Sequence, residues 1–282
     1  IHRRGQFDAF FPTPQSRNLV ICVPGIGAKK GFSALAMNCI PDVQLQYNGQ
    51  CFPLYYYEST DYEQLSLFDQ TEDDYIRRDG ISDFILARSR KLYGPKTSKE
   101  DIFYYVYGLL HSNDYCSRFE ADLTKMLPRI YLVESAKLFK TISTIGRELT
   151  EIHVNYETVE KWPDVFVSTF SEELIIEKMK FAKLEGNDDK RCIVLNNHVR
   201  VENIPLRAYE YVINGRSAIE WLMDRYQYAE HSASKLKNNP NAWGKEHGNP
   251  EYILDILLRI ITVSMKTMQL VEKLPAIDFQ TS

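Results

Sequence analysis

The sequence predicts a mixed α+β fold in which strands and helices are grouped rather than alternating along the chain. Three observations support this prediction. Short apolar runs bounded by Pro and Gly occur in the first 57 residues, as is typical of strands. Apolar residues at helical spacing dominate residues 80–152. Strand-like runs return after residue 165, and the chain ends in long helical segments. We therefore expect a β-rich N-terminal part, a helical middle, and antiparallel strands followed by C-terminal helices.

The composition is that of a folded protein with a sizeable core. The chain has 282 residues, of which 44% are hydrophobic and 26% charged, which excludes disordered, collagen-like and membrane classes. The formal net charge of -4 argues against a sequence-blind nucleic-acid coat protein but permits a locally basic face. Five cysteines without a C-x-x-C pair indicate a reducing, cytoplasmic location. The chain begins at Ile1 without a signal-peptide pattern, and we expect it to be a piece of a longer polypeptide.

The first part of the chain, residues 1–57, contains two strand-like runs. These runs are residues 19–23 and 52–57. Residues 58–79 then contain eight acidic residues against two basic ones, so we predict a solvated connection there. The N-terminal part is therefore expected to be a small β structure that leads through an acidic linker into helices.

The helical middle, residues 80–152, opens with apolar residues at helical spacing around Phe84. Ser98 and Asp101 have the spacing of a capping box and predict the start of the next helix. The body of this predicted helix is apolar and aromatic from Ile102 to Leu110. Further helices are expected before Val154.

The last part, residues 153–282, returns to strands before it ends in helices. We predict antiparallel strands at residues 165–170, 174–181 and 192–201, with a turn at residues 186–188. Asn214 and Gly215 indicate a second turn, and Ser217 with Glu220 predicts a capped helix. The final helix is expected over residues 250–273 and carries too many charges to cross a membrane.

Two patterns resemble catalytic or cofactor motifs, and neither fits well. The glycines of residues 25–31 lack the spacing of a dinucleotide or Walker motif, so we interpret the segment as a turn between strands and expect no bound cofactor. Asp164, Asp188 and Lys190 formally match a Mg²⁺-dependent nuclease pattern. However, residues 188–190 fall in the predicted turn, which favours a solvated turn over a nuclease. The six histidines have no metal-ligand spacing, so no metal site or enzyme centre is predicted.

Basic and amide side chains in predicted loops are the remaining candidates for function. Arg and Lys bind phosphate or guanine edges, and Asn binds adenine. Each cluster taken alone is more often ordinary protein surface than a binding site. The DNA-binding candidates are Lys29, Lys30, Arg77, Arg78, Asn196, Asn197, Arg200, Lys235, Lys237 and Asn238.

Several stretches together resemble the C-terminal specificity domain of type ISP restriction-modification enzymes. The resemblance covers almost the whole chain and includes the Tyr-Gly-Leu-Leu-His-Ser sequence of residues 107–112 and the Leu-Pro-Arg-Ile sequence of residues 127–130. It extends over residues 20–27, 32–35, 51–58, 101–112, 127–130, 204–211, 214–226, 238–243 and 250–265.

The resemblance implies a target recognition domain that binds double-stranded DNA. It would present an asymmetric site to an adenine-N6 methyltransferase and to helicase and nuclease modules outside this chain, which would use S-adenosylmethionine, ATP and Mg²⁺. No methyltransferase or Walker motif occurs here, so the segment itself is expected to be non-catalytic. No base-reading residue follows from the resemblance, because recognition loops vary with the DNA site. Two alternatives stay open: a module that couples methyltransferase to helicase, and the stand-alone nuclease.

Overall fold

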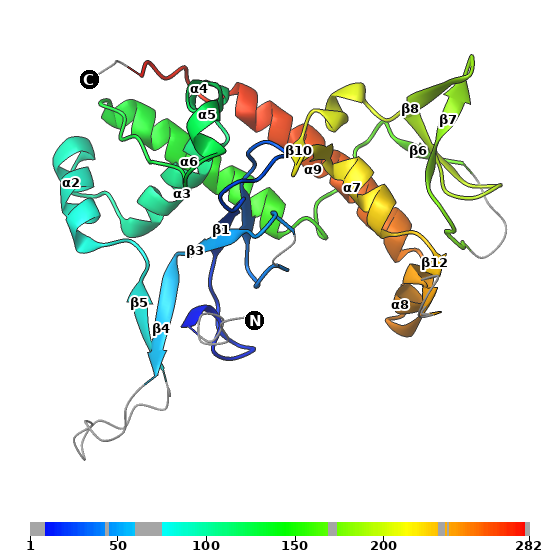
Figure 1. Ribbon diagram of the computed structural model, residues 1–282, viewed down its shortest axis with the longest axis horizontal. Helices are drawn as coiled ribbons and strands as arrows, with labels where there is room; N and C mark the ends of the chain where they lie inside the picture. Colours follow the sequence, from blue (N-terminus) through cyan, green and yellow to red (C-terminus); the bar gives the residue numbers. More distant parts are fainter. Residues whose placement is uncertain are drawn as a thin grey trace. The chain divides into compact units, whose positions relative to one another are not determined.

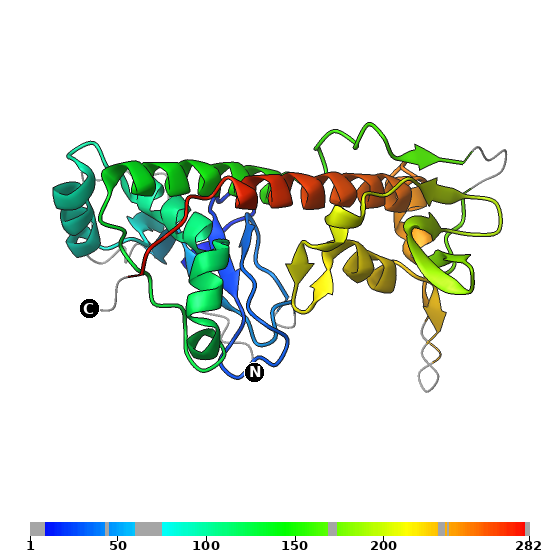
Figure 2. The same cartoon turned by 90° about the horizontal axis from the view of Figure 1, so that it is seen from above.

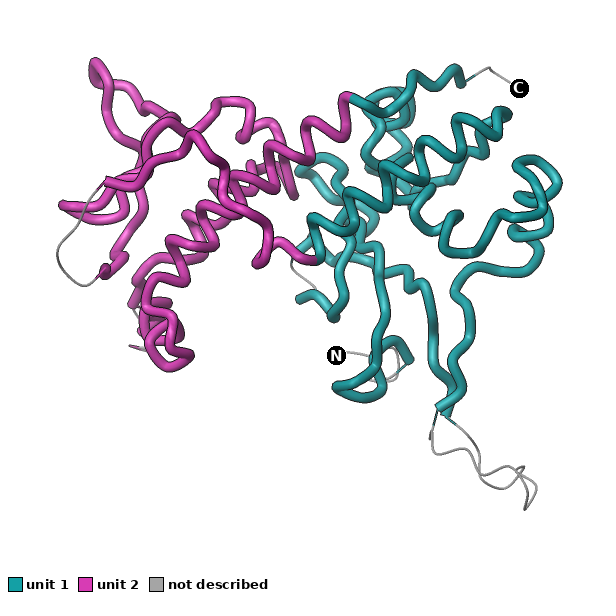
Figure 3. The backbone as a smooth tube through the Cα atoms, turned by 180° about the vertical axis from the view of Figure 1, so that it is seen from behind, with its two compact units in different colours: residues 1–154, 273–282 teal, residues 155–272 magenta. Residues whose placement is uncertain are grey.

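The computed structural model describes residues 9–42, 45–59, 75–168, 174–230, 235 and 237–279. The chain forms two compact units (Figure 3). Unit 1 comprises residues 1–154 and 273–282, and unit 2 comprises residues 155–272. Each unit combines helices with small antiparallel sheets, so the predicted α+β class is confirmed (Figure 1). The four-part subdivision of the chain at residues 57, 79 and 152 stays a prediction, because the compactness of the two units does not test it.

Unit 1 contains a three-stranded sheet with β1 (Val20–Val23) at its centre. β1 pairs in antiparallel fashion with β2 (Leu35–Met37) and β3 (Gln50–Pro53). All four residues of β1 are buried, which explains why it is a continuous apolar run and not an alternating one. The connection from β1 to β2 contains Gly27 and Gly31 at φ of 84° and 80°, a region that favours glycine. The predicted glycine turn is thus observed.

The prediction of a solvated acidic connection at residues 58–79 is wrong at both ends of this segment, where the structure has strands. β4 (Tyr55–Ser59) pairs with β5 (Tyr75–Asp79) as an antiparallel hairpin, and residues 60–74 lie outside the described residues. Composition misled the prediction here because the strands carry their acidic residues next to basic and aromatic partners. Asp79 is opposite Tyr55, and Glu58 forms an ion pair with Arg78 at 3.0 Å.

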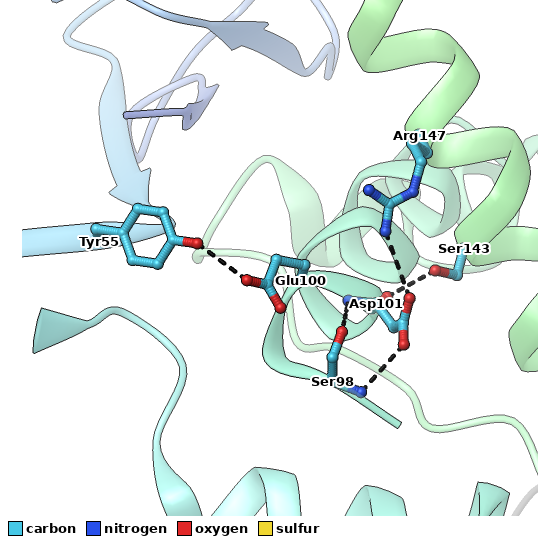
Figure 4. A network of polar contacts seen from close by, with 6 residues as sticks. All are labelled: Tyr55, Ser98, Glu100, Asp101, Ser143 and Arg147. Atoms are coloured by element: carbon cyan, nitrogen blue, oxygen red, sulfur yellow. Dashed lines mark hydrogen bonds and ion pairs between the residues drawn. The ribbon is translucent and has the colours of Figure 1, made fainter. Parts of the chain in front are cut away.

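The helical part of unit 1 is built on the pair α3 (Lys99–Leu110) and α6 (Ala136–Val154), beside α2 (Asp83–Tyr93). The Ser98 hydroxyl accepts from the Asp101 N–H at 3.1 Å, and the Asp101 carboxylate accepts from the Ser98 N–H at 3.0 Å, so the predicted capping box is confirmed (Figure 4). Asp101 also connects the two helices, because its carbonyl accepts from the Ser143 hydroxyl at 2.8 Å. Two short helices, α4 (Asn113–Arg118) and α5 (Glu120–Leu123), follow α3.

Two histidines lie in the interior of unit 1 around Tyr107. The Tyr107 hydroxyl accepts from the Ala36 N–H at 2.9 Å and is hydrogen-bonded to His153 Nδ1, 2.6 Å away. His111 Nδ1 lies 2.9 Å from the Tyr107 carbonyl. Burial lowers the pKa of His111 to about 4 and holds the pKa of His153 well below its usual value. Both imidazoles are therefore neutral in the folded chain at neutral pH.

We expect acid to destabilise unit 1 between about pH 6.5 and pH 4. As the pH falls, the histidines of the unfolded chain take up protons before those of the folded chain. The free energy of unfolding therefore has its full value above about pH 6.5 and decreases below it, by up to about 3 kcal/mol for His111. Urea denaturation at pH 7.5 and pH 5.0 measures this loss. The His111→Asn, His153→Asn double variant should lose less stability over that interval than the native chain. An equal loss in both proteins would show that other groups are responsible.

Unit 2 has a four-stranded antiparallel sheet in the order β6-β9-β8-β7. Its strands are β6 (Phe166–Val167), β7 (Lys180–Leu184), β8 (Asn187–Val194) and β9 (Arg200–Glu202). Two predictions need correction. The strand expected at 174–181 begins only at Lys180, and the strand expected at 192–201 is two strands separated by a loop. The turn also lies earlier than predicted, at Glu185 and Gly186, whose φ values are 51° and 85°.

Helices and short hairpins complete unit 2. Asn214 and Gly215 form the predicted turn between β10 (Val212–Ile213) and β11 (Arg216–Ser217). The Ser217 hydroxyl accepts from the Glu220 N–H at 3.2 Å and caps α7 (Ala218–Arg225), as predicted. The long α9 (Tyr252–Glu272), red in Figure 2, packs beside α7. Among the described residues, no helix has the length and apolar character that a membrane crossing requires. The remaining elements are η2 (Leu206–Tyr209), β12 (Ala229–Glu230), β13 (Lys237–Asn238) and α8 (Pro240–Glu246).

Candidate nucleic-acid interface

The residues predicted to bind DNA are divided between the two units. Unit 1 contains four of them, all basic, and unit 2 contains the amides with further basic residues. We therefore describe each group within its own unit. The unit 1 residues are Lys29, Lys30, Arg77 and Arg78, and the unit 2 residues are Asn196, Asn197, Arg200, Lys235, Lys237 and Asn238.

Lys29 and Lys30 lie on the exposed loop between β1 and β2. Backbone hydrogen bonds fix this loop: the Gly25 N–H donates to the Tyr47 carbonyl at 3.1 Å, and the Gly27 N–H donates to the Thr124 carbonyl at 3.2 Å. Neither lysine has an ion pair with a described residue. The loop thus presents two adjacent ammonium groups on a supported backbone, which suits contact with phosphate.

Arg77 and Arg78 are adjacent on β5 and are already engaged within the hairpin. Arg78 forms an ion pair with Glu58 at 3.0 Å, and the Arg77 guanidinium lies 4.4 Å from the centre of the Tyr55 ring. The Tyr55 hydroxyl donates to Glu100 at 2.9 Å, which connects the hairpin to α3 (Figure 4). Burial and this carboxylate raise the pKa of Tyr55. A DNA phosphate would compete with these partners, so the two arginines are weaker candidates than the lysines.

In unit 2, Asn196 stabilises the loop between β8 and β9. Its side-chain oxygen accepts from the His198 and Val199 N–H groups, both at 2.8 Å. Its side-chain nitrogen donates to the Ile175 carbonyl at 3.0 Å. The Asn196 amide therefore supports the loop backbone and is largely occupied, whereas Asn197 beside it is exposed.

A buried amide, Asn241, holds the chain just before β7. Its side-chain oxygen accepts from the Ile176 N–H at 2.9 Å, and its side-chain nitrogen donates to the Ile176 carbonyl at 2.8 Å. The Tyr228 N–H donates to the Glu177 carbonyl at 2.7 Å. Residues 174–179, which we term the clamped segment, are thus fixed by groups from the β8–β9 loop, the start of β12 and the helix α8.

An open pocket of about 380 Å³ lies on the clamped segment. The clamped segment is bonded by the predicted Asn196 at Ile175 and by Tyr228, the residue before β12, at Glu177. Lys178 and Tyr228 were not predicted from the sequence, and only the fold places them together at this pocket. The pocket is lined by Ile175, Ile176, Glu177, Lys178, Tyr228, Asn239 and Asn241.

Two of the three residues of the alternative nuclease site, Asp188 and Lys190, form ion pairs with other groups. The sequence analysis placed Asp188 and Lys190 in a turn, and this is wrong, because both lie on β8. Asp188 pairs with Lys183 at 2.6 Å, and Lys190 pairs with Glu220 at 2.8 Å. In the part of the chain that the structure describes, no group of three or more His, Cys, Asp or Glu side chains could hold a metal ion. This arrangement does not favour the nuclease interpretation.

Comparisons with known proteins are consistent with a DNA-related role. The family model described as the Type ISP C-terminal specificity domain matches residues 1–256. Solved structures similar to the chain include the ATP-dependent Type ISP restriction-modification enzyme LlaBIII bound to DNA, with 35% identity, a TM-score of 0.83, and coverage of 98% of this chain and 17% of that chain. No curated protein sequence matches the chain.

Two further solved structures are also similar to the chain. A nuclease-deletion mutant of the Type ISP enzyme LlaGI, in complex with a DNA substrate mimic, is 35% identical with a TM-score of 0.79, over 98% of this chain and 23% of that chain. The DrdV–DNA complex is 26% identical with a TM-score of 0.80, over 97% of this chain and 26% of that chain. The chain spans about a quarter or less of these structures. Since the family model and the two 35% identical relatives cover nearly all of it, the chain belongs to the family of Type ISP C-terminal specificity domains.

Proposed function

We propose that this chain is the target recognition domain of a single-polypeptide restriction-modification enzyme and that it binds a specific sequence in duplex DNA. The observation that carries the proposal is membership of the specificity-domain family over residues 1–256, together with the similarity to three structures that contain DNA or a DNA mimic. The segment is non-catalytic on this account. Its contribution is binding energy that differs between DNA sequences.

The two units offer different kinds of contact. The Lys29 and Lys30 loop has cations without acidic partners among the described residues, which suits phosphate and would set the register of the domain on the duplex. The surface of unit 2 at the clamped segment mixes amide, basic, acidic and apolar groups, among them Asn239, Lys178 and Glu177. Such a mixture suits base edges in the major groove, where each base pair presents its own pattern of donors, acceptors and methyl groups.

The surrounding enzyme belongs to the same proposal. We infer that a cytoplasmic parent polypeptide carries an adenine-N6 methyltransferase and helicase and nuclease modules outside this chain. S-adenosylmethionine, ATP and Mg²⁺ would be used by those modules. The support is the size of the relatives, of which the chain covers only 17% to 26%. The coupling of methyltransferase to helicase is not favoured as the main role, because the family is described by its specificity.

Selection from a random pool tests the proposed function. The chain is incubated with random duplex DNA at moderate salt, and the bound fraction is amplified and sequenced over several rounds. We expect an enriched asymmetric motif that contains an adenine. We also expect each mismatch in the motif to weaken binding about 5- to 150-fold, since a mismatched base pair costs about 1–3 kcal/mol. Recovery of all sequences with equal frequency would contradict recognition by this chain.

A further inference from the structure

The clamped segment is unusual because two asparagine side chains and one backbone N–H, and not a paired strand, form the hydrogen bonds to its backbone. Asn241 bonds both the N–H and the carbonyl of Ile176, and it is only 7% exposed. Asn196 bonds the Ile175 carbonyl, and the Tyr228 N–H bonds the Glu177 carbonyl. Buried amides that are fully hydrogen-bonded rigidify the backbone that they hold. The backbone of the clamped segment is therefore fixed, while some of its side chains stay exposed to solvent.

The burial of the clamped segment separates its residues into anchors and presented side chains. Leu174, Ile176 and Met179 are buried in the core of unit 2. Ile175 is 48% exposed, and Glu177 and Lys178 are also exposed. The three anchors leave little freedom for the backbone, so the three exposed side chains start from defined positions. Rigid support of this kind is what a precise binding surface requires.

The charges of the exposed side chains indicate whether they would contact the phosphates or the bases of DNA. A surface that grips phosphate is cationic, and a carboxylate within it would repel the DNA backbone. The clamped segment instead presents a cation, a carboxylate and an apolar group side by side. Lysine donates to guanine O6 and N7, glutamate accepts from cytosine N4, and an apolar side chain contacts the thymine methyl group. These three groups match base edges in the major groove.

We propose that Ile175, Glu177 and Lys178 read base edges of the target sequence and that Asn241 is a positioning residue that holds them for this task. The inference rests on the proposed function and refines it, because it assigns specificity to one segment of unit 2. Tyr228, which is 44% exposed at the same pocket, completes the surface. Asn241 itself does not touch the DNA on this account.

The test uses Lys178→Gln and Glu177→Gln, which change exposed side chains and leave the core intact. Each variant of the full chain is put through the same selection from random duplex DNA as the native chain. We expect each variant to lose or change the preference at one or two positions of the motif. Affinity for the native motif should fall about 10-fold, as loss of one good base contact implies. Because no phosphate contact is removed, the slope of log affinity against log salt should stay the same.

Lys183→Gln is the matched control. Lys183 is an exposed lysine of unit 2 on β7, where it pairs with Asp188, so its loss should leave the motif unchanged. Asn241→Asp tests the positioning role, because it replaces the donor to the Ile176 carbonyl with an acceptor. It should weaken preference at the positions that Lys178 and Glu177 read, with no change in non-specific affinity. A uniform loss on all duplexes would contradict the positioning role.

The outcomes separate this inference from the proposed function. If the native chain enriches no motif, the proposed function fails and the inference fails with it. If the native chain enriches a motif that Lys178→Gln and Glu177→Gln both retain with native affinity, only the inference is overturned. A changed motif in the Lys183→Gln control would also overturn it, because specificity would then not be confined to the clamped segment.

Discussion

Replacing Gly146 with alanine is expected to unfold unit 1 or to destabilise it by about 3 kcal/mol. Gly146 and Gly108 are where α6 and α3 cross in close backbone contact. A Cβ atom built on Gly146 would lie far closer than 3.0 Å to the Tyr104 carbonyl oxygen, and one built on Gly108 would collide with the Ile142 carbonyl. Backbone atoms in a packed helix pair cannot move aside locally, so the helices would have to separate. Thermal and urea denaturation measure the loss.

The sign of this effect is the informative result. At an open helical position, Gly→Ala stabilises by up to about 1 kcal/mol, because alanine has the higher helix propensity. Thr144→Ala, on the exposed face of the same helix, is the matched control and should be neutral or slightly stabilising. A Gly146→Ala variant as stable as the native chain would contradict the close crossing of α3 and α6.

Reversing both charges of the β1–β2 loop, with Lys29→Glu and Lys30→Glu, is expected to weaken binding to all duplexes at least about 10-fold. If each lysine contacts one phosphate, the slope of log affinity against log salt should decrease by about 1.8, since each phosphate contact contributes about 0.9. The selected motif should not change, because phosphate contacts do not distinguish bases. Affinity measured at several salt concentrations gives both quantities.

Lys137→Glu with Lys140→Glu is the control for this double variant. Both lysines are exposed in unit 1 on α6, so the net charge changes by the same amount at a different place. We expect a smaller loss of affinity and a nearly native salt slope. If the two double variants behave alike, the effect belongs to net charge and the β1–β2 loop does not contact phosphate.

The elements that the sequence predicted correctly are those that local chemistry specifies. The capping residues Ser98 and Ser217 predicted the starts of α3 and α7, because a cap needs only residues three positions apart. The Asn214–Gly215 turn and the glycine turn after β1 followed from the positive φ that these residues tolerate. The apolar run bounded by Pro and Gly predicted the strand β1, which the structure shows to be fully buried.

The errors arose where distant residues decide the structure. The β4–β5 hairpin was predicted as a linker because its acidic composition outweighed the pairing of Tyr57 with Arg77, which composition does not show. The clamped segment was predicted as a strand because its apolar residues form a strand-like run in the sequence. Asn241, 65 residues from Ile176, supplies the hydrogen bonds that a strand partner would otherwise supply. Long-range contacts of this kind leave no signal in a local window of sequence.

Only part of the candidate site could be predicted from the sequence, because some of its residues come together only through long-range contacts. Clusters of basic and amide residues along the chain are visible in the sequence, and they gave Lys29, Lys30 and Asn197. Lys178 and Tyr228 lie 50 residues apart and share one pocket only in the fold. The sequence also could not show that Asn196 and Asn241 bond the backbone, since an asparagine that supports a loop and one that reads adenine are the same residue type.

Exchange of this domain between enzymes tests the central claim most directly. Residues 1–282 replace the corresponding domain of a Type ISP enzyme whose methylated site is known, and the methylated adenines of the host genome are mapped by sequencing. Reinsertion of the recipient's own domain through the same junctions is the control and should methylate the recipient's site. We expect the hybrid to methylate a new sequence that equals the motif selected by the isolated chain. Continued methylation of the recipient's original site would contradict target recognition and would show that the chain only couples modules.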